Sequence, residues 1–343
     1  MKTLFIIFSL ILIFNQKVAF SQDLAFDSWL FELKAEARKQ GISNDLLEKA
    51  FFDVKPIERV LELDKKQPEF TLTVTKYLHN VVSKKRIVKG RYLLLSNESL
   101  LNRIEKKFNI PGNLIIALWG IETNFGDHSG SFSVISALTT LAFDGRRSAF
   151  FRKELINALK ILNDGHVELS KMKGSWAGAM GQCQFMPSTF LQYAIDYNGD
   201  GKKDLWGSKE DALASAANYL SKMGWDSSSS WGMEVMARNK NEYDYWSSVG
   251  QLKPTKSKGE KRAGYKKGTM KDWSASFRNL DKSIIPESDI EARLLVLGKG
   301  DITENPRRFF LVHKNFDVIL KWNRSNFFGI AVGKLSDQIQ YAK

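Results

Sequence analysis

Glu122 is the residue of this sequence best placed for acid–base chemistry. It lies near the end of residues 110–126, which read Ile-Pro-Gly-Asn-Leu-Ile-Ile-Ala-Leu-Trp-Gly-Ile-Glu-Thr-Asn-Phe-Gly. Pro111 suits the first turn of a helix, and the glycine at position 126 suits its end. Ile115, Leu118 and Glu122 then share one helix face, because they recur at spacings of three and four. The pattern places a carboxyl group at the end of an apolar face.

An apolar face and the negative end of a helix both disfavour an ionised carboxylate. The pattern therefore predicts a raised pKa for Glu122. A carboxyl group of this kind can act as a general acid. The alternative is an ordinary boundary glutamate that pairs with a lysine or an arginine.

A glycine-rich segment, residues 174–190, offers groups that could hold a ligand. Glycines and alanines alternate in it, which allows the backbone to approach a ligand closely. The side chains that could donate or accept hydrogen bonds there are Ser175, Gln182 and Gln184. A tightly packed turn without a ligand explains the same composition.

Residues 196–207 resemble the first half of an EF-hand loop. The side chains that would bind a metal are Asp196, Asn198, Asp200 and Asp204. Gly207 stands where that loop requires a bidentate glutamate. The pattern leaves two readings open, a structural calcium or sodium ion and an empty polar turn. A calcium switch is disfavoured, because the second helix–loop–helix of an EF-hand pair is missing.

Composition limits the classes of partner. The 343 residues are 43% hydrophobic, enough for a large core and a second domain, and their formal net charge is +13. Such an excess suits an anionic polymer or a membrane surface, whereas no zinc-finger spacing or aromatic-rich RNA motif points to nucleic acid. Four histidines without a His-Glu-x-x-His motif argue against a zinc hydrolase, and the single cysteine, Cys183, excludes an intramolecular disulfide.

Residues 1–21 are predicted to be a signal peptide. Lys2 precedes the apolar run Leu4–Phe14, and Ala19-Phe20-Ser21 resembles a small-x-small cleavage site. The run is too short to span a bilayer comfortably, and no cysteine nearby indicates a lipoprotein. We expect export to the periplasm without a transmembrane span in the mature chain, and the alternative is an uncleaved anchor.

Helical periodicity dominates the remaining chain. Helices are expected at 27–40, 43–52, 70–95, 99–108, 134–143, 148–162, 211–223, 316–322 and 330–339. A β-type run lies at 309–313, and the basic segment 253–268 is expected to be an exposed loop. The basic run Lys84–Lys89 is expected to be a solvated helix face. This plan divides the mature chain into a helical catalytic region, 22–225, and a part with a small β subdomain, 226–343.

With these residues assembled, the chain resembles the B-type lytic murein transglycosylases, glycoside hydrolase family 103. The motifs that carry the resemblance are Gly120–Gly126, Arg146-Arg147, Gly174–Gly181, Gln184–Ser188, the Asp-rich loop with Trp206, Ala217–Tyr219, Trp322–Ser325 and Ala331–Gly333. They follow one another in order from about residue 26 to residue 339. The sequence departs from the family at Phe328, where a tyrosine is usual, and at Cys183, a variable position.

The resemblance implies a mainly α fold with a small β part, lysozyme-like, with a substrate groove between lobes. It implies cleavage of peptidoglycan at the β-1,4 bond between N-acetylmuramic acid and N-acetylglucosamine, without a required cofactor. By carry-over, Glu122 is the catalytic acid/base. The substrate-binding residues would be Ser175, Gln184, Arg146, Arg147, Tyr77, Met180, Phe185, Tyr219 and Asn323. Partners would be glycan strands and, in addition, proteins of cell-wall synthesis or division.

The residues favour a mechanism with one carboxylate. Most glycosidases use two, yet Asp127 and Asp144, the acids nearest to Glu122 in sequence, lie in polar turn-like segments. The acetamido group and C6 hydroxyl of the substrate would then take the second role and produce a 1,6-anhydro sugar. The alternatives are a hydrolytic muramidase and an inactive peptidoglycan-binding scaffold.

Overall fold

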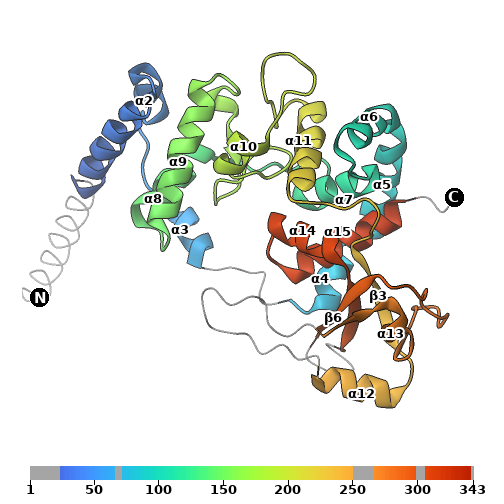
Figure 1. Cartoon of the computed structure of the whole chain (residues 1–343). Coiled ribbons are helices and arrows are strands. Elements are labelled where there is room, and N and C mark those ends of the chain that lie inside the picture. Colours follow the sequence, from blue (N-terminus) through green and yellow to red (C-terminus); the bar gives the residue numbers. More distant parts are fainter. Residues whose placement is uncertain (1–23, 66–71, 250–265, 299–305, 341–343) are drawn as a thin grey trace, which may run out of the picture. The chain divides into compact units, whose positions relative to one another are not determined.

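The computed structural model describes residues 24–65, 72–249, 266–298 and 306–340, and most of its regular structure is helical (Figure 1). This confirms the predicted fold class, mainly α with a small β part. The chain divides into two units. Unit 1 comprises Met1–Gln67, Ser129–Gln192 and Gly199–Trp206; unit 2 comprises Pro68–His128, Tyr193–Asn198 and Gly207–Lys343. The predicted signal peptide, residues 1–21, lies outside the described residues, and the predicted division at residue 225 stays a prediction.

Unit 1 is helical except for one short antiparallel ribbon. Its helices cover 24–39, α2 (Asn44–Ala50), α3 (Glu58–Lys65), α8 (Val134–Asp144), α9 (Ser148–Asn163) and α10 (Pro187–Tyr193), whose last residue is assigned to unit 2, and there is a short 3-10 turn at Leu169–Lys171. Strand β1 (Phe132–Ser133) pairs with β2 (Lys173–Gly174). The helix predicted from Ser43 is confirmed, because the Ser43 hydroxyl accepts the Leu46 N–H and caps α2.

The central helix of unit 2 is α7 (Gly112–Thr123). Its neighbours are α5 (Lys84–Ser96), α6 (Glu98–Phe108), α11 (Lys209–Lys222) and α15 (Asn326–Ile339). Every residue from Leu114 to Gly120 is buried, so α7 is apolar on all sides. A helix of this composition is stable only when other helices enclose it. Among the described residues, no helix has the length and apolar character needed to cross a bilayer.

The single long helix predicted at 70–95 is wrong. The chain forms two helices there, α4 (Val74–Val81) and α5, with Val82 and Ser83 between them. Ser83 has extended backbone angles, and its hydroxyl accepts the N–H of Arg86. A serine at this position ends one helix and caps the next, because its hydroxyl replaces a backbone acceptor.

The β part of unit 2 is a five-stranded antiparallel sheet in the order β4-β6-β7-β3-β5. The strands are β3 (Gly232–Ala237), β4 (Lys267–Thr269), β5 (Phe277–Arg278), β6 (Glu291–Leu297) and β7 (Arg308–Val312), and the β-type run predicted at 309–313 is confirmed as β7. Side chains such as Val235, Leu294 and Phe309 form a core with Trp273 of α13 (Met270–Ser274). Tyr243 and Trp246 of α12 (Lys240–Val249) pack on it, and Figure 1 shows α12 and α13 beside these strands.

A three-residue ion cluster joins the opposite face of the sheet to α15. Glu234 of β3 accepts two hydrogen bonds from Arg308 of β7, at 2.6 and 2.8 Å, and a third from Lys334 of α15. The side chain of Glu234 is only 9% exposed. Burial raises the pKa of Glu234, but Arg308 and Lys334 outweigh burial, so its pKa lies below the usual value.

We expect Glu234→Gln to destabilise unit 2 at neutral pH by about 2 kcal/mol, because two partly buried cations lose their partner. An acid with a lowered folded pKa contributes stability above its unfolded pKa, near 4.3, and loses it as pH falls through the folded value. The difference between wild type and variant should therefore shrink below about pH 4.

Urea unfolding of both proteins at about pH 7 and at about pH 3.5, on either side of the ordinary pKa of glutamate, measures this difference. Glu291→Gln on β6 is the matched control, because its ion pair with Lys267 is about two-thirds exposed. We expect that control to change stability by less than about 0.5 kcal/mol. A loss for Glu234→Gln that is equal at both pH values would contradict the account.

Candidate active site

Glu122 stands in the last turn of α7, next to a backbone turn of unusual conformation. The helix ends at Thr123, and Asn124 and Phe125 follow with φ of 53° and 65°. The helix thus stops before Gly126, where the sequence predicted its end, because asparagine also tolerates the left-handed conformation of a helix cap. Left-handed non-glycine residues cost energy and cluster at functional sites.

Phe125 anchors this turn against α7. Its ring meets the ring of Trp119 edge to face, with centroids 5.8 Å apart. A Cβ atom on Gly120 would lie 2.6 Å from the Phe125 ring, so only glycine allows this contact. The position of the turn, and with it the direction of Glu122, is fixed by packing.

The carboxylate of Glu122 is held by Trp322, the last residue of α14 (Lys314–Trp322). The indole Nε1 of Trp322 donates a hydrogen bond to Glu122 Oε1 at 2.7 Å. Glu122 is half-buried, while its predicted face-mates Ile115 and Leu118 are buried. Periodicity and spacing did not predict this role of Trp322, although Trp322 opens the closing motif.

Tyr219 of α11 packs against Trp322. The two rings meet edge to face at 5.1 Å, and the Tyr219 hydroxyl donates to the Lys321 carbonyl at 2.8 Å. Burial, together with Tyr193, raises the pKa of Tyr219 to about 12, so this donor keeps its proton at neutral pH. Because Tyr219 is buried, at 8% exposed, its ring is held in place by its neighbours. The ring in turn positions Trp322, which holds Glu122.

Glu122 lines a cavity of about 430 Å³ within unit 2. The residues that line it are Ser83, Lys85, Arg86, Ile121, Glu122, Thr123, Asn124 and His128. Glu122 is the one carboxylate among these described lining residues. Asp127, which follows the turn, is exposed and pairs with Lys89 at 2.6 Å.

Arg86 departs from the solvated helix face predicted for the basic run of α5. It is half-buried, and burial lowers its pKa, while Tyr77 acts in the opposite direction. Tyr77 of α4 packs against Phe327 with ring centroids 5.5 Å apart. Asn323, which follows Trp322, lines another hollow of unit 2, of about 520 Å³, and accepts the N–H of Ser325 at 3.0 Å.

The predicted sugar-binding residues Ser175 and Gln184 belong to unit 1. The Ser175 hydroxyl accepts backbone N–H groups of Ala177 and Ala179, at 3.3 and 3.1 Å. The Gln184 side chain donates to the Ser129 carbonyl at 3.0 Å, and its φ is 51°. Both side chains stabilise the glycine-rich turn, and their contact with a sugar stays a prediction.

Met180 and Phe185 lie inside unit 1. Met180 is fully buried, Phe185 is 3% exposed, and their backbones form an isolated antiparallel bridge. Cys183 and Phe328, the two departures from the family pattern, are each 4% exposed. These buried residues belong to the cores of their units. The predicted groove contacts of Met180 and Phe185 stay predictions.

The two arginines 146 and 147 have different neighbours in unit 1. Arg146 binds the buried carboxylate of Asp64 through Nε at 3.1 Å and through Nη2 at 3.2 Å. Arg147 stacks its guanidinium over the rings of Phe150 and Phe151, at 5.4 and 4.9 Å. Arg146 therefore has a structural partner, and its predicted contact with substrate stays a prediction.

One carboxylate next to the Asp-rich loop was not part of the sequence pattern. Asp211, fully buried at the start of α11, accepts the N–H groups of Tyr197 and Asn198, at 2.9 and 3.3 Å. Its oxygen and one of Asp196 lie within 4.8 Å of each other. In unit 1, Asp200 and Asp204 each accept a backbone N–H two residues ahead, both at 2.8 Å.

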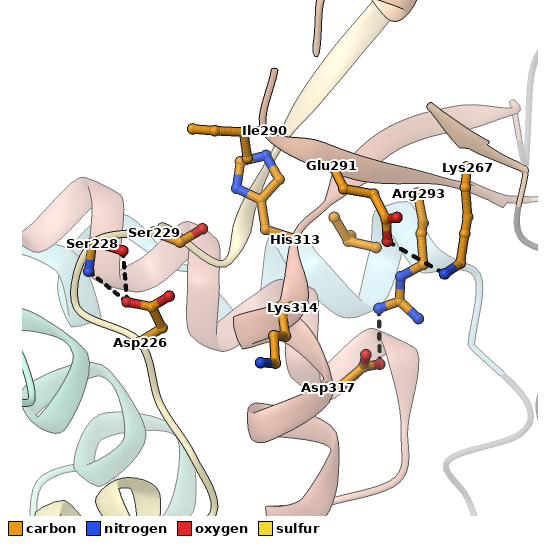
Figure 2. A pocket seen from close by; sticks show the side chains of 11 residues that line it. Asp226, Ser228, Ser229, Lys267, Ile290, Glu291, Arg293, His313, Lys314 and Asp317 are labelled. Atoms are coloured by element: carbon orange, nitrogen blue, oxygen red, sulfur yellow. Dashed lines mark hydrogen bonds and ion pairs between the residues drawn. The ribbon is translucent and has the colours of Figure 1, made fainter. Parts of the chain in front are cut away.

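A separate hollow of about 480 Å³ lies beside the sheet of unit 2 (Figure 2). Six of its lining residues form pairs: Lys267 with Glu291 at 3.3 Å, Arg293 with Asp317 at 2.8 Å, and Asp226 with the hydroxyl of Ser228 at 2.6 Å. Glu122 is not among the residues that line it. We assign the chemistry to the cavity of Glu122 and not to this hollow.

The family model described as "Transglycosylase SLT domain" matches residues 25–337. Membrane-bound lytic murein transglycosylase B of Escherichia coli (strain K12) is 32% identical over 197 residues, which are 54% of this chain and 54% of that protein. The chain thus aligns with about half the length of this relative.

Solved structures with similar folds cover more of the chain. SltB3 from Pseudomonas aeruginosa, solved in complex with NAG-anhNAM-pentapeptide, is 37% identical with a TM-score of 0.80, covering 92% of this chain and 79% of that one. Slt35 from Escherichia coli, solved in complex with calcium, is 26% identical with a TM-score of 0.69, covering 92% of each. The resemblance inferred from the motifs is confirmed.

We expect a chelator to lower the melting temperature of this protein, and added calcium to restore it. Repulsion between the carboxylates of Asp196 and Asp211 is the physical reason, since a bound cation would cancel it. Asp196→Asn should remove the response to calcium. Asp45→Asn, at an exposed aspartate of α2, should retain it. Identical melting curves with chelator and with calcium would show that the loop binds no calcium.

Proposed function

Because the chain belongs to the transglycosylase SLT domain family, we propose that it is a peptidoglycan lytic transglycosylase. The bond cleaved is the β-1,4 link from N-acetylmuramic acid to N-acetylglucosamine. One observation carries the proposal: a half-buried carboxylate, Glu122, is fixed by Trp322 at 2.7 Å in a cavity that has no second carboxylate among its described lining residues. The bound ligands named for SltB3 support the same substrate class.

We propose that Glu122 acts first as an acid and then as a base. Its proton passes to the leaving glycosidic oxygen as the bond to muramic C1 breaks. The acetamido oxygen of the same sugar stabilises the positive charge at C1. Glu122 then takes the proton of the C6 hydroxyl while O6 bonds to C1. The product carries a 1,6-anhydro ring, and no water is consumed.

Trp322 gives this sequence of steps its geometry. A carboxylate that must protonate one oxygen and deprotonate another has to stay in one orientation through both steps. The hydrogen bond from Nε1 fixes Oε1, and the contact of Trp322 with Tyr219 fixes the indole. A water-poor cavity around Glu122 would favour ring closure over hydrolysis.

We propose that residues of unit 1 hold the sugar strand. Ser175 and Gln184 would steer the acetamido group, and Arg147 would meet the peptide or the sugar. Arg146 would act mainly through its bond to Asp64, which orders the segment next to Arg147. Met180 and Phe185 would support this surface from below, because both are buried.

We propose export to the periplasm, where peptidoglycan lies, through the predicted signal peptide. The basic composition, +13 overall, suits a polymer with peptide carboxylates. No cofactor enters the proposed reaction. A calcium or sodium ion bound by the Asp-rich loop would serve the structure alone. The structure of Slt35 in complex with calcium supports calcium as the ion to test. Proteins of cell-wall synthesis or division would be the protein partners.

Glu122→Gln should abolish lysis of purified cell walls while the fold remains intact. Loss of a general acid costs about a hundred- to ten-thousand-fold in rate. Trp322→Phe keeps a ring against Tyr219 but loses the N–H, so its rate should fall between those of wild type and Glu122→Gln. Turbidity of a cell-wall suspension gives the rate, and thermal melting confirms folding.

Glu98→Gln is the matched control, because Glu98 is exposed at the start of α6. It should lyse cell walls at the wild-type rate. A folded Glu122→Gln protein with substantial activity would refute the assignment of the acid. A wild type that binds cell walls but releases nothing would favour the scaffold alternative.

A further inference from the structure

Three cations occupy the first turn of α5, where a helix disfavours them. Lys84, Lys85 and Arg86 follow the cap Ser83, and this turn contains no acidic residue. The N-terminus of a helix carries a partial positive charge, so lysine and arginine there oppose the helix dipole. Helix stability therefore does not explain these residues.

Two of the three face the cavity of Glu122. Lys85 and Arg86 line it, together with Ser83, whereas Lys84 is not part of the lining. Lys84 and Lys85 are both exposed, and Arg86 is half-buried. One turn later on the same helix, Lys89 pairs with Asp127 at 2.6 Å. Lys89, which does not line the cavity, therefore has a carboxylate partner.

Lys85 and Arg86 have no ion-pair partner among the described residues. Arg86 donates from Nη1 to the Val81 carbonyl, a contact that orients the guanidinium, and its buried Nε has no acceptor. A half-buried guanidinium without a carboxylate is costly, because burial removes water and nothing replaces the lost hydrogen bonds. A ligand that brings a carboxylate into the cavity would remove this cost.

We propose that Lys85 and Arg86 form an anion-binding subsite that takes a carboxylate of the peptide attached to the glycan strand. This inference rests on the proposed function, since it concerns the cavity of the same acid. The subsite would make the enzyme select strands whose peptides carry free carboxylates close to the bond that is cleaved. Arg86 suits this task because its planar fork binds a carboxylate through two hydrogen bonds.

The test compares two soluble tetrasaccharide-peptides that differ only in charge. One carries free peptide carboxylates, and in the other each carboxylate is a carboxamide. Equilibrium binding is measured in the Glu122→Gln background, so that the ligand stays intact. We expect the free-carboxylate ligand to bind about tenfold more tightly, and this preference should weaken as salt is added.

Arg86→Gln and Lys85→Gln should each bring the ratio of the two dissociation constants toward one. Arg86→Lys should retain part of the preference for the free-carboxylate ligand. Lys84→Gln is the matched control, because it removes the same charge from the same turn outside the cavity. It should leave the preference unchanged. If Arg86→Gln fails to fold after losing the bond to Val81, Lys85→Gln decides.

Equal binding of the two ligands by the parent protein would overturn the subsite. So would a preference that survives both Arg86→Gln and Lys85→Gln, or one that Lys84→Gln reduces as much. If the preference depends on Lys85 and Arg86 but the wild type cleaves no glycan, the subsite stands and the proposed function falls. If the wild type cleaves glycan and the Glu122→Gln parent binds both ligands equally, the proposed function stands and the subsite falls.

Discussion

The hydrogen bond from Trp322 to Glu122 is the interaction on which the candidate active site depends. It joins the end of α7 to the end of α14 across 200 residues of sequence, at 2.7 Å. Each partner is fixed by its own surroundings: Glu122 by the buried α7 and the Phe125 turn, and Trp322 by the ring and hydroxyl contacts of Tyr219. A group that first donates and later accepts a proton needs such fixed geometry in both steps.

The sequence was sufficient to place Glu122 at the end of an apolar helix face, because that signal is local. Ile115, Leu118 and Glu122 lie within two helical turns, so periodicity alone places them on one face. Trp322 could not be assigned a role in the same way, since its contact with Glu122 spans two distant segments. Asp211 was missed for a similar reason: it stands in a helix start, four positions beyond the end of the EF-hand-like pattern.

Prediction of the helices also succeeded where the sequence signal was clear and failed where the pattern concealed a helix end. The helices with clear caps were predicted within a few residues, such as α2 behind Ser43. The merged helix at 70–95 was wrong because Ser83 caps a helix in the middle of a continuous periodic pattern. That error also hid the basic first turn of α5. A run of lysines within a long helix indicates a solvated face, whereas the same run at a helix start, beside a carboxylate, needs another explanation.

The central claim is that one carboxylate and the substrate itself complete the reaction. Mass spectrometry of the soluble products of purified peptidoglycan, without borohydride reduction, tests it most directly. The account predicts muropeptides that end in 1,6-anhydro-N-acetylmuramic acid, one water molecule lighter than hydrolysis products. Reducing-end muropeptides as the dominant species would contradict the account and favour a hydrolytic muramidase, which would need a base or nucleophile that the described lining of the Glu122 cavity does not contain.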